Sequence, residues 1–174
     1  HNLLTYSEDF SNWLGIRASG TETSFIEDST AAATHILQSP AAISFSAVTT
    51  TISVEVKANG REQVGLNLSE GSGLAGVCIV DLSDQSVVTL GAFDSATVTL
   101  ASDGYYKCVF VGQVTAAGSY SVYIRAAVAG SGVYSGDGVS GFSLRRAHVY
   151  RSDLGGMADV PLDERGVASA AKYL

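Results

Sequence analysis

The 174-residue sequence has few basic residues, few cysteines and no long apolar run. Ten lysines and arginines stand against 17 aspartates and glutamates, for a net charge of −7, and this balance excludes a protein that binds nucleic acid mainly by electrostatics. Two cysteines are too few for a disulfide scaffold. No apolar run approaches the roughly 20 residues that a membrane-spanning helix needs. We therefore expect no nucleic-acid partner and no insertion into a membrane.

Motifs for metal binding, nucleophilic catalysis and nucleotide binding are also lacking. No H-x-x-x-H, C-x-x-C or G-x-S-x-G motif occurs. Residues 71–76 (GSGLAG) and 136–141 (GDGVSG) fit the dinucleotide pattern G-x-G-x-x-G. That pattern holds a pyrophosphate only where a strand leads into a helix, and here strand-like residues follow both stretches. We expect turns at these glycines, and no cofactor.

What the sequence does contain is a series of short alternating apolar stretches, separated by turns rich in Gly, Asp and Ser. Ile52, Val54 and Val56, for example, alternate with polar residues, which is typical of a strand with one buried face. We expect about eight or nine strands of this kind, the longer ones at 105–114, 119–128 and 140–150. The predicted fold is all-β: a β-sandwich jelly roll of two antiparallel sheets.

The composition changes near residue 150. Acidic residues outnumber basic ones before residue 145, whereas the balance is slightly basic from 145 onward, and strand alternation ends at Tyr150. We predict one domain over residues 2–150 and an irregular tail, or a linker to another module, over 151–174. Cys78 and Cys108 lie in apolar stretches, so buried free thiols are expected, with a bridge between neighbouring strands as the alternative.

Four stretches, in order, resemble a jelly-roll module found in bacteriophage tail and tail-fibre proteins and in related prophage genes. They are residues 2–13 (NLLTYSEDFSNW), 52–58 (ISVEVKA), 103–108 (DGYYKC) and 134–142 (YSGDGVSGF). Residues 155–161 (GGMADVP) are similar to linkers beside such modules. Two departures stand out: Tyr105 replaces a common Trp, and residues 25–33 (FIEDSTAAA) replace the usual A-P-D-G-T-x-T-A stretch. A binding role of that stretch elsewhere is therefore not carried over.

The resemblance implies a non-catalytic receptor-binding or carbohydrate-binding module on a phage-like particle, such as a tail fibre or a gene transfer agent spike. Its partners are then bacterial surface polysaccharide, such as capsule, and other tail or spike proteins. Its location is the particle surface, after synthesis in the bacterial cytoplasm. A structural module that forms homo-oligomers is the alternative, and it predicts large apolar patches in place of a tyrosine-lined groove.

Sugar binding requires flat aromatic faces and planar polar groups. Tyr123 and Arg125 alternate with Val122 and Ile124, so we expect them to point away from the core. The predicted site has Tyr123 and Tyr134 as stacking platforms, with Arg125, Asp137, Arg61 and Gln63 as polar contacts. Ordinary half-burial on a β-surface is the alternative for each of these residues.

Other residues give weaker indications. Trp13 and Tyr106 are assigned to the core. A polysaccharide depolymerase needs two carboxyl groups at a set separation, and the candidates are Glu55, Glu62, Glu70 and Asp81. Asp9, Asp28 and Asp137 are candidate ligands of a structural Ca²⁺. The net negative charge disfavours an anionic capsule, so binding to one would depend on local groups such as Arg61 and Arg125.

Overall fold

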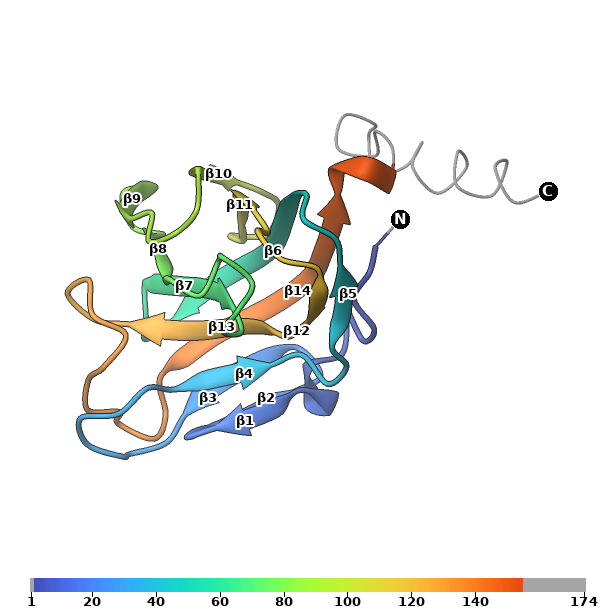
Figure 1. Cartoon of the computed structure of the whole chain (residues 1–174). Coiled ribbons are helices and arrows are strands. Elements are labelled where there is room, and N and C mark those ends of the chain that lie inside the picture. The colour runs from blue at the N-terminus through green and yellow to red at the C-terminus, as the bar shows by residue number, and fades with distance from the viewer. Residues whose placement is uncertain (1, 155–174) are drawn as a thin grey trace.

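In the computed structural model, the segments with alternating apolar and polar residues form strands. These strands pair into two six-stranded antiparallel sheets that pack face to face (Figure 1). The structure describes residues 2–154. The first sheet has the order β1 (Leu14–Ile16), β4 (Ile36–Gln38), β13 (Val122–Ala127), β7 (Gln63–Leu68), β8 (Cys78–Asp81) and β9 (Ser86–Thr89). The second has the order β10 (Ser95–Leu100), β11 (Tyr106–Gln113), β6 (Thr49–Asn59), β14 (Gly141–Arg151), β3 (Ser24–Glu27) and β2 (Ala18–Thr21).

The strand order confirms the predicted jelly roll. In chain order, β3, β4, β6, β7, β8, β11, β13 and β14 form the two halves of the sandwich. The order β3-β14-β6-β11 in the second sheet faces β4-β13-β7-β8 in the first, so the first and last of these strands are neighbours and the sandwich wraps on itself. This wrapping brings the β13–β14 loop and the β6–β7 connection, far apart in sequence, to one end of the sandwich.

The core lies between the sheets and consists of the alternating apolar residues. Ile52, Val54 and Val56 on β6 are almost completely buried, as their spacing predicts. Trp13 is buried and Tyr106 packs against the core, which confirms both assignments. The large side chains with the least exposure are Phe10, Phe25, Phe110, Phe142, Leu37, Ile52, Leu66, Leu68, Leu74, Leu82, Ile124 and Leu144.

Both cysteines are buried and free, as expected. Burial raises the pKa of Cys78 to about 11, and that of Cys108 to about 12. The two thiols therefore act as small apolar side chains of the core.

The strands are more numerous than predicted, with fourteen in the described residues. Several of the extra strands, such as β1, β2, β5 (Ile43–Phe45) and β12 (Gly118–Tyr120), have only three or four residues, too few to show an alternation. The stretch 119–128 is also two strands instead of one. Ser121 separates β12, which pairs with β5, from β13, which pairs with β4 and β7.

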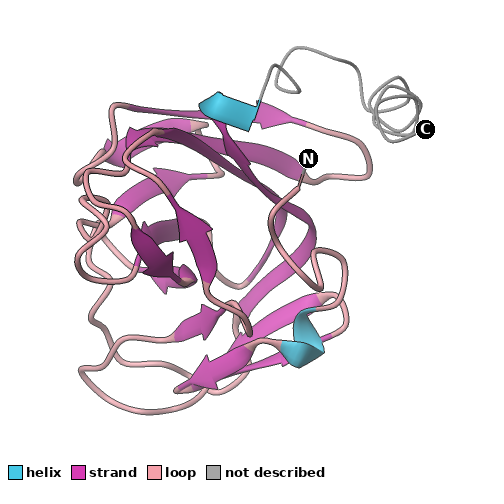
Figure 2. Cartoon of the chain, turned by 45° about the vertical axis from the view of Figure 1, so that its right-hand side comes forward, coloured by secondary structure: helices cyan, strands magenta, loops and turns pink. Residues whose placement is uncertain are grey.

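The two ends of the described chain meet beside β14. Leu3 N donates to Val149 O at 3.1 Å. The Asn2 side-chain amide donates to Ala147 O and accepts from Val149 N on the same strand. Helix is limited to two short 3₁₀ turns within residues 2–154, η1 (Phe10–Asn12) and η2 (Ser152–Leu154) (Figure 2). η2 follows β14 directly and ends at Leu154. The rest of the predicted tail, residues 155–174, lies outside the described residues.

Candidate functional site

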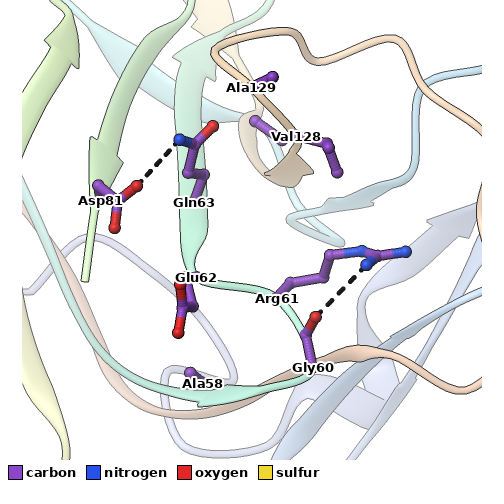
Figure 3. A pocket seen from close by; sticks show the side chains of 9 residues that line it. Ala58, Gly60, Arg61, Glu62, Gln63, Asp81, Val128 and Ala129 are labelled. Atoms are coloured by element: carbon purple, nitrogen blue, oxygen red, sulfur yellow. Dashed lines mark hydrogen bonds between the residues drawn. The ribbon is translucent and has the colours of Figure 1, made fainter. Parts of the chain in front are cut away.

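An open pocket of about 310 Å³ lies where β6 leads into β7, beside the last residues of β8 and β13 (Figure 3). Strand register assembles it, because Gln63 lies opposite Asp81 on one side and Ala127 on the other. The pocket is lined by Ala58, Gly60, Arg61, Glu62, Gln63, Asp81, Ala127, Val128 and Ala129. Two of the predicted site residues, Arg61 and Gln63, therefore line one pocket.

One wall of the pocket is a fixed pair of polar groups. Gln63 Nε2 donates to Asp81 Oδ2 at 2.9 Å, while Gln63 Oε1 accepts from Gly130 N at 2.7 Å. Asp81 Oδ1 accepts from both the backbone N–H and the hydroxyl of Ser83. Burial acts to raise the pKa of Asp81, but the hydrogen bonds from Ser83 and Gln63 outweigh it and the pKa is lowered. Asp81 is thus an ionised acceptor held in place.

Arg61 extends away from this pair, as Figure 3 shows. Its guanidinium binds Glu27, a buried acid that was not among the predicted site residues. Arg61 Nε donates to Glu27 Oε2 at 3.0 Å and Arg61 Nη2 donates to Glu27 Oε1. Glu27 is only 2% exposed, and its hydrogen bond is the largest cause of the raised pKa of Arg61. Glu27 shares a strand face with the buried Phe25, and this alternation was the signal that would have placed the acid inside.

Two more predicted residues, Tyr134 and Asp137, also contact Glu27. The Tyr134 hydroxyl donates to Glu27 Oε2 and Asp137 N donates to Glu27 Oε1. We call Glu27, Arg61, Tyr134 and Asp137 the Glu27 cluster. It ties β3, the β6–β7 connection and the β13–β14 loop together at one end of the sandwich.

The partners of Tyr134 fit a structural role better than an open stacking platform. Its ring lies 4.7 Å from the ring of His35, and Arg61 Cζ lies 5.3 Å from the ring centroid. Burial, with the hydrogen bond to Glu27, raises the pKa of Tyr134 well above its usual value. The half-buried phenol is therefore a neutral donor fixed in the Glu27 cluster.

Asp137 organises the loop that precedes β14. Its carboxylate accepts from Ser140 Oγ, Ser140 N and Val139 N, and these bonds, the Ser140 hydroxyl first, lower its pKa strongly. Both G-x-G-x-x-G stretches lead into strands, β8 and β14. Gly71 lies in a turn and Gly73, Gly76 and Gly138 lie in bends, close to the expected turns, whereas Gly141 is the first residue of β14.

Tyr123, Arg125 and Gln63 lie on the outer face of the first sheet. Val122 and Ile124 are buried in the core, so their neighbours Tyr123 and Arg125 point outward, as predicted. Arg125 is nevertheless only 9% exposed, because the β13–β14 loop covers it. The six predicted residues thus divide between this outer face and the Glu27 cluster, with the pocket between them lined by Gln63 and Arg61.

Of the four acids considered for a depolymerase, two meet in the pocket, Glu62 and Asp81. Glu55 is buried on the other sheet, where Arg145 and Arg146 neutralise it. Glu70 is exposed in the β7–β8 loop.

The candidate calcium ligands are not brought together. Asp9 caps η1, Asp28 binds Thr30 N and lies 3.3 Å from His35 Nε2, and Asp137 holds its own loop. In residues 2–154 no three His, Cys, Asp or Glu side chains form a group that suits a metal ion. In the same part of the chain, no helix has the length and apolar character needed to cross a membrane.

Comparison with protein-family models and with curated proteins finds no match to the sequence. The function is therefore inferred from the geometry of the pocket and of the outer face beside it, together with the resemblance of the four sequence stretches.

Proposed function

We propose that this chain is a non-catalytic carbohydrate-binding module of a phage-like tail fibre or spike, which attaches to polysaccharide on a bacterial surface. A jelly roll supports many functions, so the fold alone does not identify one. The observation that carries the proposal is the pocket at the β6–β7 connection, where the Gln63 amide and the Asp81 carboxylate are held in fixed orientations. Planar amides and carboxylates are the groups that hydrogen-bond sugar hydroxyls.

The size and position of the pocket support this proposal. Its volume of about 310 Å³ is at the small end of the range of about 300–1,000 Å³ for ligand pockets, which suits a sugar unit rather than a large cofactor. From Gln63 the outer face of the first sheet continues past Arg125 to Tyr123. Four residues along a strand span about 13 Å, so Tyr123 lies within the length of a short sugar chain bound in the pocket.

Binding without catalysis fits the electrostatics better than hydrolysis. A glycosidase needs one carboxylic acid with a raised pKa to protonate the leaving group. The pKa of Asp81 is lowered, and Gln63 occupies one of its oxygens. Glu62 does line the same pocket, so a depolymerase is the second candidate. The measurement is release of reducing ends from a bound polysaccharide, and release that Glu62→Gln abolishes would favour the enzyme.

A structural module that forms homo-oligomers is the third candidate. It is favoured by the edge strand β9 and the residue after it, where Val87, Val88 and Leu90 are each about 40% exposed. Light scattering coupled to size-exclusion chromatography distinguishes a monomer from a trimer.

The binding function is tested on a glycan array and on bacterial cells. We expect the chain to be retained, and Gln63→Ala to weaken binding about tenfold, because losing well-placed hydrogen bonds costs about 1–1.5 kcal/mol. The matched control is Gln113→Ala at the exposed end of β11 on the other sheet, which we expect to bind normally. Retention on no glycan and on no cell would refute the proposed function.

A further inference from the structure

Arg125 is a buried guanidinium without a carboxylate partner. It is 9% exposed, and within residues 2–154 it forms no ion pair. Its one hydrogen bond to the described residues runs from Nη2 to the neutral amide oxygen Oδ1 of Asn67. Nε is buried with no partner, whereas Nη1 is also without a partner but is not fully enclosed. Nη1 is therefore the nitrogen of the guanidinium that a ligand can reach, while Nε stays enclosed.

The other arginines of the described chain are either exposed to solvent or paired with carboxylates. Arg17 is exposed to solvent. The rest have carboxylates: Arg61 pairs with Glu27 and Asp137, Arg145 with Glu55 and Asp103, Arg146 with Glu55, and Arg151 with Asp153. Of the two arginines expected to offer local positive charge, Arg61 is thus already neutralised, and Arg125 is not.

A buried charge without a counter-ion is costly to the fold. Burial lowers the pKa of Arg125, but a guanidinium starts above 12 and remains charged at neutral pH. The positive charge is therefore present, and the described residues provide no anion to compensate it. An anion from outside the chain would remove this cost on binding.

Tight packing fixes the stem of Arg125. Two glycines flank its stem: a Cβ on Gly65 would lie 2.7 Å from Arg125 Cγ, and a Cβ on Gly132 would lie 3.4 Å from Arg125 Cδ. Tyr123, half-buried, is the next outward residue on the same strand, opposite Gln38. An aromatic ring, an amide and a guanidinium on one face can contact the ring, the hydroxyls and the carboxylate of an acidic sugar.

We infer that the outer face around Arg125 binds the carboxylate of an acidic sugar, so that the polysaccharide recognised by this chain contains uronic-acid units. This inference rests on the proposed function and specifies its ligand class. A single guanidinium matches the single charge and planar shape of a carboxylate. A terminal phosphomonoester carries up to two charges and would call for a second cation, which the nearby described residues do not supply.

The test compares uronate-containing polysaccharides with their carboxyl-reduced forms, in which each carboxylate is replaced by a hydroxymethyl group, by calorimetry on the full chain. We expect the acidic form to bind at least tenfold more tightly. Arg125→Met should remove this preference, and Arg125→Lys should restore only part of it because lysine lacks the planar fork. A merely structural arginine would instead lower Tm when replaced, whereas removal of an uncompensated buried charge should leave Tm unchanged or raise it.

The outcomes separate this inference from the proposed function. Equal binding of the acidic and reduced forms, or a preference that survives Arg125→Met, overturns the carboxylate site but leaves carbohydrate binding intact. Binding of sulfated glycans alone on the array also overturns it. Binding of no glycan of any kind overturns both the inference and the proposed function.

Discussion

Two buried charged residues, Glu27 and Arg125, differ in how far neighbouring groups compensate their charge. Glu27 accepts hydrogen bonds from Arg61, Tyr134 and the backbone of Asp137, so its charge is fully compensated. Arg125 has one neutral acceptor. Breaking the first arrangement leaves buried polar groups without partners, whereas the second already leaves a buried charge without a counter-ion among the described residues.

Replacing Glu27 tests the structural role of its cluster. Glu27→Ala leaves the Arg61 guanidinium and the Tyr134 hydroxyl without their main partner, and we expect it to lower the free energy of unfolding by about 3 kcal/mol. Glu22→Ala is the matched control, since Glu22 is exposed in the neighbouring β2–β3 turn, and should change it by less than about 0.5 kcal/mol. Urea unfolding gives both values. Equal effects of the two substitutions would show that the Glu27 cluster contributes nothing to stability.

For Glu27 and Arg125, the sequence predicts which face of the sheet each side chain lies on, but it does not predict what covers that face. Alternation with Phe25 is sufficient to place Glu27 on a buried face. Alternation with Ile124 correctly placed Arg125 on the outer face. Its burial depends on the path of the β13–β14 loop over that face, which no local pattern encodes.

At the scale of elements, β7 and β13 form the base of the proposed binding face, and their fit depends on Gly65. A Cβ there would lie 2.7 Å from Arg125 Cγ and 3.0 Å from Val77 Cγ1. We expect Gly65→Ala to displace Arg125, to destabilise the chain by about 1–3 kcal/mol through overpacking, and to weaken binding of acidic sugar. Chemical unfolding and calorimetry measure the two effects.

Gly132→Ala is the control for that variant, because it also adds a methyl group next to Arg125. Its Cβ would sit 3.4 Å from Arg125 Cδ, an ordinary contact, and Gly132 has no positive φ. We expect stability within about 0.5 kcal/mol of the parent chain. A Gly65→Ala variant that behaves like Gly132→Ala would mean that the position of Arg125 does not depend on this packing.

Long strands could be predicted from sequence and changes of partner could not. β6 and β11 have eleven and eight residues, enough for several alternating pairs. β12 and β13 continue one alternation through Tyr120, Val122 and Ile124, yet the backbone changes partner at Ser121, whose N–H and C=O bind Ser69 instead. Side-chain alternation reports which face is buried, and it does not report which strand lies alongside.

At the scale of the whole molecule, the net charge of −7 opposes approach of an acidic polysaccharide, whereas Arg125 favours a carboxylate once it is in contact. The long-range repulsion is screened by salt within about 10 Å at 0.1 M, and the buried contact is screened much less. This combination selects for a ligand that fits the site and against anionic polymers in general.

The same excess of acids predicts how the fold responds to pH. Hydrogen bonds lower the pKa of several aspartates in the folded chain: the Ser140 hydroxyl acts on Asp137, the Ser102 hydroxyl on Asp103, and other donors on Asp28, Asp81 and Asp153. The unfolded chain, with aspartate pKa values near 3.9, takes up protons first as the pH falls, so the stability from these groups is complete above about pH 5 and is lost below about pH 4. We expect these aspartates to leave Tm, followed by circular dichroism, nearly constant from pH 7 to 5 and to make it fall steeply toward pH 2.5.

Asp137→Asn should lower Tm at pH 7 and make the fall of Tm at acid pH less steep, because one of the carboxyl groups with a lowered pKa no longer titrates. A Tm that stays constant down to pH 2.5 would contradict the stabilising role of these carboxylates.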